Sequence, residues 1–465
     1  MLDVVVVAFE ALAVATVAPR VARDLGGLDL YGWTFAAFML ANLVSVVISG
    51  HAADRHGPAP PFAAGLLLFT SGLLVCGLAP TMPVLVLGRA IQGLGAGALL
   101  ATAYVAIGRA YDEHERPRQF ALLSTAWVVP GLVAPGLAGV IAEQFGWRFV
   151  FLGLAGLPLL AAWLSLPQMR LLGPSGRESG ALPIRSALSL AGGAGLVVGG
   201  LGANSFLVGA PLVALGVALG VPAFRKLTPP GTVRARRGLP AAIATRGLET
   251  FAFFGADAFL ALTLASVRGL SPIDVGIVLT PSTLTWTCGS WLQARRSGRW
   301  SRRAMTTAGV ALVAGGIVAA SAVLIPEVPV WVAAVAWGIA GLGMGLSYST
   351  TAVTVLSEAD SAGQPGAATA ALQLSDVLGQ ALGTGIAGAI VAVALSSGWA
   401  RRDALVIVFA VMVVVAALSV AAARRFPPDP KRLSEAVPSE PAVDQPLSGH
   451  TLISRADGAD EEPTR

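Results

Sequence analysis

The sequence contains little charge and almost no cysteine. Only 12% of its 465 residues are charged, against about a quarter in a typical soluble domain, so a water-covered surface is not expected. The two cysteines, Cys76 and Cys288, each lie inside an apolar run, which fits neither a disulfide framework nor a cysteine-based metal site. A Walker A motif, a nucleophile elbow and a metal-binding helix are also missing, so neither ATP-driven transport nor hydrolytic chemistry has support.

Apolar residues, by contrast, make up 55% of the chain, and its mean hydropathy is +0.73. They fall in blocks of about 20 residues, the length that an α-helix needs to cross the hydrocarbon core of a bilayer. We therefore predict an all-α membrane protein with fourteen transmembrane helices. Their expected ranges are 2–20, 32–52, 61–79, 83–109, 118–143, 147–167, 186–203, 206–224, 239–266, 273–293, 303–324, 328–357, 364–397 and 402–423.

Most lysines and arginines of the loops fall on one side of the membrane when the N-terminus is placed in the cytoplasm. Because cytoplasmic loops carry an excess of basic residues, this pattern predicts a multi-pass protein of the inner (plasma) membrane with both termini cytoplasmic. The basic residues lie at helix ends and form no stripe with aromatics, so nucleic-acid binding is not expected despite a net charge of +5. The polar residues 425–465 are expected to form a disordered cytoplasmic tail.

Glycine patterns recur at nearly the same spacing in the two parts of the chain. The run 93–97 matches 341–345, and Gly139 matches Gly388. Such a repeat is typical of transporters built from two parallel halves with the substrate between them.

We expect two parallel six-helix halves at 1–167 and 238–424, with an inserted helix pair, the seventh and eighth, in the linker 168–237. The counterpart of the ninth helix would begin upstream of Met1, so the printed start is expected to truncate the first helix.

Six charged residues lie well inside the predicted helices, away from their ends, where a charge costs about 2.5–3.5 kcal/mol at mid-bilayer. They are Glu10, Arg89, Arg246, Glu249, Asp257 and Asp376. Arg246, Glu249 and Asp257 lie within roughly 80° of one another around one helix. Such a polar face should border the bundle interior or a wet cavity, and Glu249 is expected to pair with Arg246 one turn away.

The carboxylates among these residues are candidate proton carriers. Removal from water favours the neutral form of a carboxyl group, so one or more of them is expected to bind a proton. The alternative is a fixed ion pair or a hydrogen-bonded acid that never titrates. Glu10 and Asp257 hold nearly equivalent places in the repeat. Arg89 has no carboxylate in its own helix and must find one on a neighbour, or bind a carbonyl or the substrate.

The turn between the second and third helices carries an Asp54–Arg55 pair between Gly50 and Gly57. Asp54 is placed to cap the positive N-terminal end of another helix, a contact that can lock one conformation and release in another. The alternative is a solvated turn.

The fifth predicted helix combines prolines with glycines, so it should bend and pack tightly. The residues concerned are Pro130, Gly131, Pro135, Gly136 and Gly139. Trp127, in the same helix, either stacks on an aromatic substrate or serves as a packing or cavity-lining residue.

With these motifs, residues 1–424 resemble the Major Facilitator Superfamily, and the helix count resembles its fourteen-helix branch of drug/proton antiporters. The loop motif of the family matches Gly50, Asp54, Arg55 and Gly57, but Pro58 and Ala59 stand where the family usually has Arg or Lys. The family's Arg-x-x-Gln-Gly element, implicated in proton handling, is met by Arg89, Gln92 and Gly93.

Two further elements of the resemblance are less complete. The antiporter element Gly-Pro-x-x-Gly-Gly corresponds to 134–139, with alanine at Ala134 and Ala138. In the first helix, Glu10 precedes Pro19 where the fourteen-helix branch has an Asp before its Pro.

The resemblance implies a secondary transporter that exports hydrophobic or amphipathic small molecules by proton antiport and alternating access. It implies a monomer in the lipid bilayer that needs no cofactor, because the proton gradient drives it. Two other functions stay open: a metabolite uptake symporter or facilitator, and a membrane sensor that binds a ligand without transporting it. No catalytic constellation is present, so an enzyme is not expected.

Overall fold

The computed structural model describes residues 2–110, 128–173, 184–203, 205–296, 299–361 and 365–426. Within these ranges the chain is helical and contains no strand, as predicted. The α-helices are α1 (Leu2–Asp24), α2 (Tyr31–His56), α3 (Ala59–Leu78), α4 (Met82–Ala110), α6 (Val128–Gln144), α7 (Arg148–Leu154), α8 (Leu157–Leu171), α9 (Ile184–Leu201), α10 (Phe206–Leu227), α11 (Leu239–Ser266), α12 (Pro272–Arg296), α13 (Arg302–Ser321), α14 (Trp331–Ser361), α15 (Pro365–Ser396) and α16 (Arg401–Ala423). Three 3-10 helices accompany them, η1 (Leu28–Leu30), η2 (Thr232–Arg234) and η3 (Ala322–Leu324).

Twelve stretches of the described chain are long and apolar enough to cross a membrane. One of them, Arg148–Leu171, joins α7 and α8, so the single predicted helix 147–167 is in fact broken. The break falls just before Pro158, which has no backbone N–H to continue the helix ladder. α6 has only 17 described residues and α12 is rich in hydroxyl side chains, so neither is among the twelve. These two helices lie where the fifth and tenth spans were predicted, so the described helices occupy all fourteen predicted ranges.

The same helix packing occurs in both halves. α4 packs against α2 and α3, and α14 packs against α12 and α13 in the same way. Gly93 and Gly341 show why the glycine pattern repeats, because a side chain at either position would collide with the backbone of the partner helix, at Phe38 and Ser282 respectively. The repeated glycines are therefore places where two helices touch backbone to backbone.

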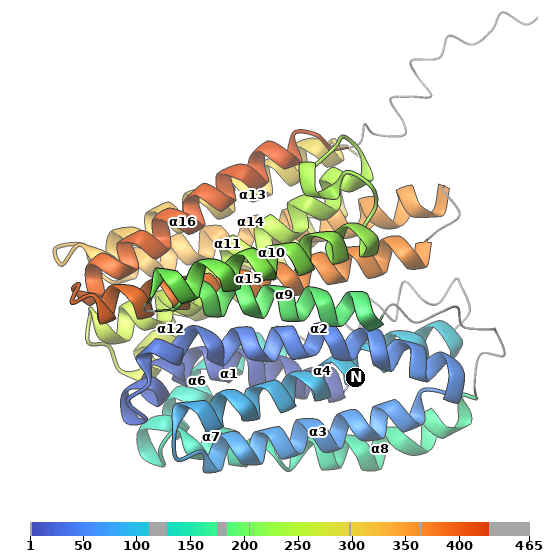
Figure 1. Ribbon diagram of the computed structural model, residues 1–465, viewed down its shortest axis with the longest axis horizontal. Coiled ribbons are helices and arrows are strands. Elements are labelled where there is room, and N and C mark those ends of the chain that lie inside the picture. Colours follow the sequence, from blue (N-terminus) through green and yellow to red (C-terminus); the bar gives the residue numbers. More distant parts are fainter. Residues whose placement is uncertain are drawn as a thin grey trace, which may run out of the picture. The chain divides into compact units, whose positions relative to one another are not determined.

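The inserted pair is a hairpin of α9 and α10. α9 lies alongside α2 and α15, whereas α10 packs chiefly against α9 (Figure 1). The outer side of α10 exposes Phe206, Leu207 and Leu215, as expected for a helix that faces lipid. The division of the chain at residues 167 and 238 stays a prediction. Of the predicted tail 425–465, the residues from 427 onward lie outside the described residues.

The halves meet along two helix pairs, α2 with α15 and α6 with α12. A Cβ added to Gly32 of α2 would come within 2.5 Å of the Cα of Gly388 in α15. In the equivalent place, a Cβ added to Gly139 of α6 would come within 2.8 Å of the Cα of Ile273 in α12. The bundle is therefore closed at the end that holds the α1–α2 and α11–α12 loops, which we call the closed end.

Candidate functional site

α11 is packed among other helices along its whole length, yet one face of it is accessible to solvent. None of its residues is exposed, but Leu248, Phe251, Phe254 and Asp257 are partly accessible and recur every three residues. From Ala258 to Ala265 every residue is buried. An accessible face on an enclosed helix borders an internal passage, and this passage stops just beyond Asp257.

α1 shows the same change along its length. Val5, Phe9 and Leu12 are partly accessible, whereas every residue from Ala13 to Pro19 is buried. Because α1 and α11 are the first helices of the two halves, the passage lies between the halves. It is blocked toward the closed end and accessible from the other end.

Glu10 of α1 and Arg89 of α4 form an ion pair beside this passage. Both side chains are buried, with 0% and 2% of their residue surface exposed. Arg89 Nε also donates to the Thr34 carbonyl at 2.9 Å, and its guanidinium lies 4.3 Å from the centroid of the Phe38 ring. Of the partners that the sequence left open for Arg89, the structure supplies a carboxylate and a carbonyl.

Gln92 completes this group from one turn further along α4. Its Oε1 accepts from Arg89 Nη1 at 3.0 Å, and its Nε2 donates to Glu10 Oε1 at 3.3 Å. Cys76 of α3 also donates to Gln92 Oε1, at 3.3 Å. The second carboxylate oxygen of Glu10 is buried without a hydrogen-bond partner among the described residues. Glu10 thus carries one oxygen that is free to bind a proton.

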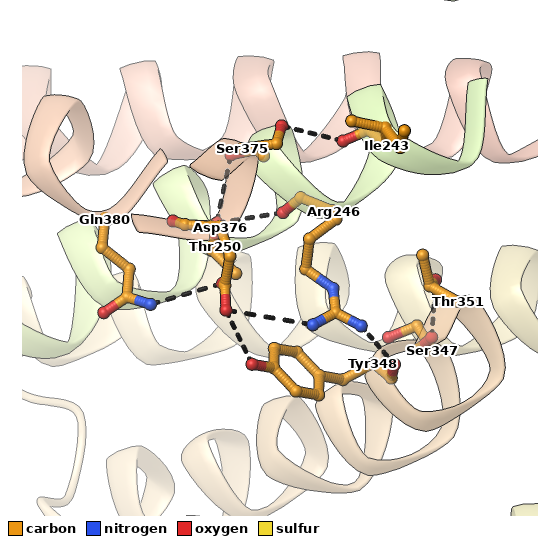
Figure 2. Close-up of polar contacts among 10 residues, drawn as sticks. Ile243, Arg246, Thr250, Ser347, Tyr348, Thr351, Ser375, Asp376 and Gln380 are labelled. Carbon is orange, nitrogen blue, oxygen red and sulfur yellow. Dashed lines mark hydrogen bonds and ion pairs between the residues drawn. The ribbon is translucent and has the colours of Figure 1, made fainter. Parts of the chain in front are cut away.

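The second half contains a corresponding ion pair, between Arg246 of α11 and Asp376 of α15 (Figure 2). Arg246 Nη1 lies 4.0 Å from Asp376 Oδ2, which accepts from the Tyr348 hydroxyl at 2.7 Å. Gln380 donates to the other oxygen of Asp376 at 3.3 Å. The guanidinium of Arg246 lies over the Tyr348 ring, 3.3 Å from its centroid, and also donates to the Tyr348 carbonyl. Tyr348 of α14 therefore holds both members of the pair.

The predicted pairing of Glu249 with Arg246 is wrong. Arg246 turns away toward α14 and α15, where Tyr348 and Asp376 offer it a ring face, a carbonyl and a carboxylate. Glu249 is fully buried and accepts instead from the Ser347 hydroxyl. Its other oxygen has no hydrogen-bond partner among the described residues.

Asp257 lies at the blind end of the passage, and its surroundings differ from those of Glu10. Its Oδ1 accepts from the indole N–H of Trp337 at 2.9 Å. Asp257 belongs to none of the ion pairs formed among the described residues. The repeat places Glu10 and Asp257 on corresponding turns, but only Glu10 faces an arginine.

The fifth-helix residues contribute differently to the contact between the halves. Gly139 touches the backbone of α12, and a side chain at Gly131 would collide with Thr283 of α12. The Pro135 carbonyl would lie 2.7 Å from a Cβ added to Gly276, whereas a Cβ at Gly136 would meet nothing within 4 Å. Pro130 is buried. Tight packing therefore depends on some of these positions and not on Gly136.

Two parts of the predicted site, Trp127 and the side chain of Asp54, lie outside the described residues. In the same turn, Arg55 is exposed and Gly57 has a φ of +87°, a backbone conformation that favours glycine.

A group of aromatic residues at the passage was not identified from the sequence. Trp286 of α12 contacts Phe253 and Phe254 of α11, with ring centroids 5.6 and 6.4 Å apart, and Tyr348 at 5.3 Å. In the sequence these residues are indistinguishable from other apolar residues of their helices. The signal that could have found them is their position relative to the lipid-facing side of each helix.

Tyr31, at the start of α2, fastens the two halves together at the closed end. Its hydroxyl donates to the Ala258 carbonyl of α11 at 2.7 Å, and its ring packs edge-on against Phe259 at 5.2 Å. Tyr31 is fully buried. Opening the closed end must break this hydrogen bond, since its two members belong to different halves.

Tyr31→Phe is expected to favour opening of the closed end by a few-fold. The change removes one hydroxyl, and a hydrogen bond of this kind contributes about 0.5–1.5 kcal/mol. Thr81 and Glu327 are exposed in loops of the two halves at this end. Double electron–electron resonance between spin labels at these two positions should show a larger population of long distances. An unchanged distance distribution would mean that Tyr31 does not fasten the gate.

Residues 4–384 match the sequence profile of the Major Facilitator Superfamily. A probable multidrug-efflux transporter of Mycobacterium tuberculosis is 25% identical over 414 residues, which cover 85% of this chain and 87% of that protein. The methylenomycin A resistance protein of Streptomyces coelicolor is 27% identical over 325 residues, or 68% of each chain.

Solved structures share the fold. A peptide transporter POT in complex with alafosfalin superposes with a TM-score of 0.65 at 16% identity, covering 91% of this chain and 93% of that one. The xylose transporter XylE from E. coli, in a partially occluded inward open conformation, gives a TM-score of 0.61 at 14% identity, with coverage of 90% and 94%.

Proposed function

The chain belongs to the Major Facilitator Superfamily, and from this premise we propose that it exports hydrophobic or amphipathic small molecules in exchange for protons. The family and the structural neighbours make it a multi-pass membrane transporter and not an enzyme. Small-molecule substrates follow from the family. The direction of transport, the proton and the drug-like substrate are the proposed part.

The buried Glu10–Arg89 pair carries the proposal. A buried charge is stabilised by its partner, and removing one charge of such a pair is costly. Protonation of Glu10 would cancel its charge and release Arg89, and the unpaired oxygen of Glu10 supplies a place for that proton. One proton taken up from the outside can therefore change which arrangement of the two halves is favoured.

The pair formed by Arg246 and Asp376 supports a second step of the same kind in the other half. Protonation of Asp376 would cancel its charge, and so weaken its hold on Arg246 and on the Tyr348 hydroxyl. Asp257, at the blind end of the passage, is the carboxylate that a proton or substrate from the open end reaches. Neutralising each of the three acids in turn by mutation shows which one carries the coupled proton.

Export is favoured over uptake by the relatives. The relatives with the stated coverage bear the names multidrug-efflux transporter and methylenomycin A resistance protein. With the basic loops placed in the cytoplasm, both termini are cytoplasmic and the closed end faces outward. The structure then represents the state that collects substrate from the cytoplasmic side. A monomer is sufficient for this cycle, since the passage lies within one chain.

Proteoliposomes separate the candidate functions. They are loaded with tetraphenylphosphonium, an amphipathic probe, and the outside is made more acidic than the lumen. An antiporter exchanges entering protons for the probe and accelerates its efflux. A symporter carries the probe inward together with the protons and therefore slows its net loss from the liposomes. A facilitator gives flux that ignores the gradient, and a sensor gives no flux beyond the passive leak of the probe from protein-free liposomes. The measurement is repeated with other amphipathic probes. If the acid outside accelerates the efflux of none of them, proton-coupled export is refuted.

A further inference from the structure

Three partly accessible aromatic side chains form a continuous surface in the second half, and we call them the aromatic wall: Phe254 of α11, Trp286 of α12 and Tyr348 of α14. Ring centroids lie 6.4 Å apart between Phe254 and Trp286 and 5.3 Å apart between Trp286 and Tyr348, and both pairs are tilted. Behind the wall, Phe253 packs edge-on against Trp286 at 5.6 Å and stacks on the buried Trp337 at 4.8 Å. The wall therefore has a fixed, well-packed backing.

The wall faces the passage and not the lipid. On α12 the large apolar side chains that are exposed are Ile277, Leu284 and Trp291, spaced seven residues apart. At about 100° per residue, Trp286 lies roughly 160° around the helix from Leu284. On α14, Tyr348 lies roughly 180° around the helix from the exposed Ile339. Phe254 belongs to the accessible face of the enclosed α11.

Charged groups border the wall at both ends. At one end Asp257 lies three residues after Phe254 on the accessible face of α11, where it accepts from Trp337 behind the wall. At the other end the Tyr348 hydroxyl donates to Asp376, and Arg246 covers the face of the Tyr348 ring. A ligand that lies on the wall would thus touch a residue that holds the Arg246–Asp376 pair.

We propose that the aromatic wall is a binding subsite for the planar aromatic part of the transported molecule. This inference rests on the proposed function, and it specifies the substrate class of the same passage. Aromatic rings prefer offset or edge-on partners at centroid distances of 4.5–7 Å, and such pairs are favourable beyond the area that they bury. The tilted rings of the wall leave edges and faces available for such contacts.

Two probes of equal charge test the proposal. Tetraphenylphosphonium carries aromatic rings, and tetrabutylphosphonium carries only aliphatic chains. Binding of each is measured by calorimetry on the full-length protein purified in detergent, with no gradient present. The wild-type protein should prefer the aromatic probe, and Trp286→Leu should weaken that probe about tenfold while changing the aliphatic probe by less than about twofold.

Trp291→Leu is the matched control. It makes the same substitution on the same helix, but Trp291 is 63% exposed on the lipid-facing side, so both affinities should stay unchanged. Phe254→Leu serves as the second variant if Trp286→Leu fails to fold, and it should reproduce the selective loss. Equal binding of the two probes, no binding of either, or an equal loss of both in the variants would overturn the subsite.

The binding assay and the flux assay fail independently. Selective aromatic binding without proton-driven flux would remove the proposed export and retain the subsite. Proton-driven flux of both probes that Trp286→Leu leaves unchanged would remove the subsite and retain the proposed export.

Discussion

Glu10→Gln is expected to reduce proton-driven efflux to the rate measured without a pH gradient. Glutamine keeps the shape of the side chain and its hydrogen bonding to Gln92, but it carries no charge and binds no proton at neutral pH. Exchange of labelled for unlabelled probe across proteoliposomes, which needs no gradient, should continue. Loss of the gradient response with retained exchange is the signature of an uncoupled transporter.

The same variant should also be less stable, for a reason that can be separated from coupling. Removing one member of a buried ion pair leaves the other charge uncompensated, at a cost of about 3–5 kcal/mol. Arg89 would keep only the Thr34 carbonyl, Gln92 and the Phe38 ring. In the double variant Glu10→Gln with Arg89→Gln, thermal stability should recover because the lone charge is gone, while proton coupling should remain absent.

The control for Glu10→Gln is Asp403→Asn, which neutralises an exposed carboxylate at the start of α16. It should leave efflux and stability unchanged. If Glu10→Gln responds to the gradient as the wild type does, Asp257→Asn and Asp376→Asn identify the carrier instead. Full coupling in all three variants would end the assignment of the proton to these carboxylates.

Gly139→Ala is expected to shift the conformational equilibrium toward the state in which the two halves have separated at the end with the α1–α2 and α11–α12 loops. The added methyl group would lie 2.8 Å from the Ile273 Cα and 3.0 Å from the Pro272 carbonyl oxygen. Backbone atoms on both sides cannot rotate away, and overpacking of this kind costs about 1–3 kcal/mol. Since the contact exists only when the halves meet at this end, the equilibrium should shift by roughly 5- to 150-fold.

Gly136→Ala is the matched control, because it adds the same atom to the same helix one turn away. A Cβ at Gly136 would meet nothing within 4 Å, so the equilibrium should not move. Spin labels at Thr81 and Glu327 report the separation of the two halves in each variant. Equal distance distributions in Gly139→Ala and Gly136→Ala would show that the backbone contact does not control closure.

The two glycines illustrate how far sequence reasoning reached. The sequence pointed to Gly136 and Gly139 together, since both belong to the proline–glycine pattern of the fifth predicted helix. Only the structure separates them, because the rotation of α6 about its axis decides which one meets α12. That rotation depends on how many side chains pack at once, and a glycine pattern does not report it.

The charged residues show the same limit. Insertion cost made all six of them candidates for the interior, and Glu10, Arg89, Arg246, Glu249 and Asp376 are indeed buried. Their partners were not all predicted correctly. Proximity along the helix predicted a pair of Arg246 with Glu249, whereas Arg246 of α11 pairs with Asp376 of α15. Partners on separate helices are brought together by tertiary contacts that neighbours in sequence do not reveal.

The amino-acid sequence by itself determined the helical class, the fourteen passes and the duplicated plan. These follow from the length of apolar runs, measured against the thickness of a bilayer, and from glycines that recur with the repeat, all of which can be read along one dimension. The tertiary structure alone decided the ion-pair partners, the closed end, the cross-half bond of Tyr31 and the aromatic wall. Each of these depends on the rotation of one helix against another, which is set by the sum of many small packing contacts across the bundle.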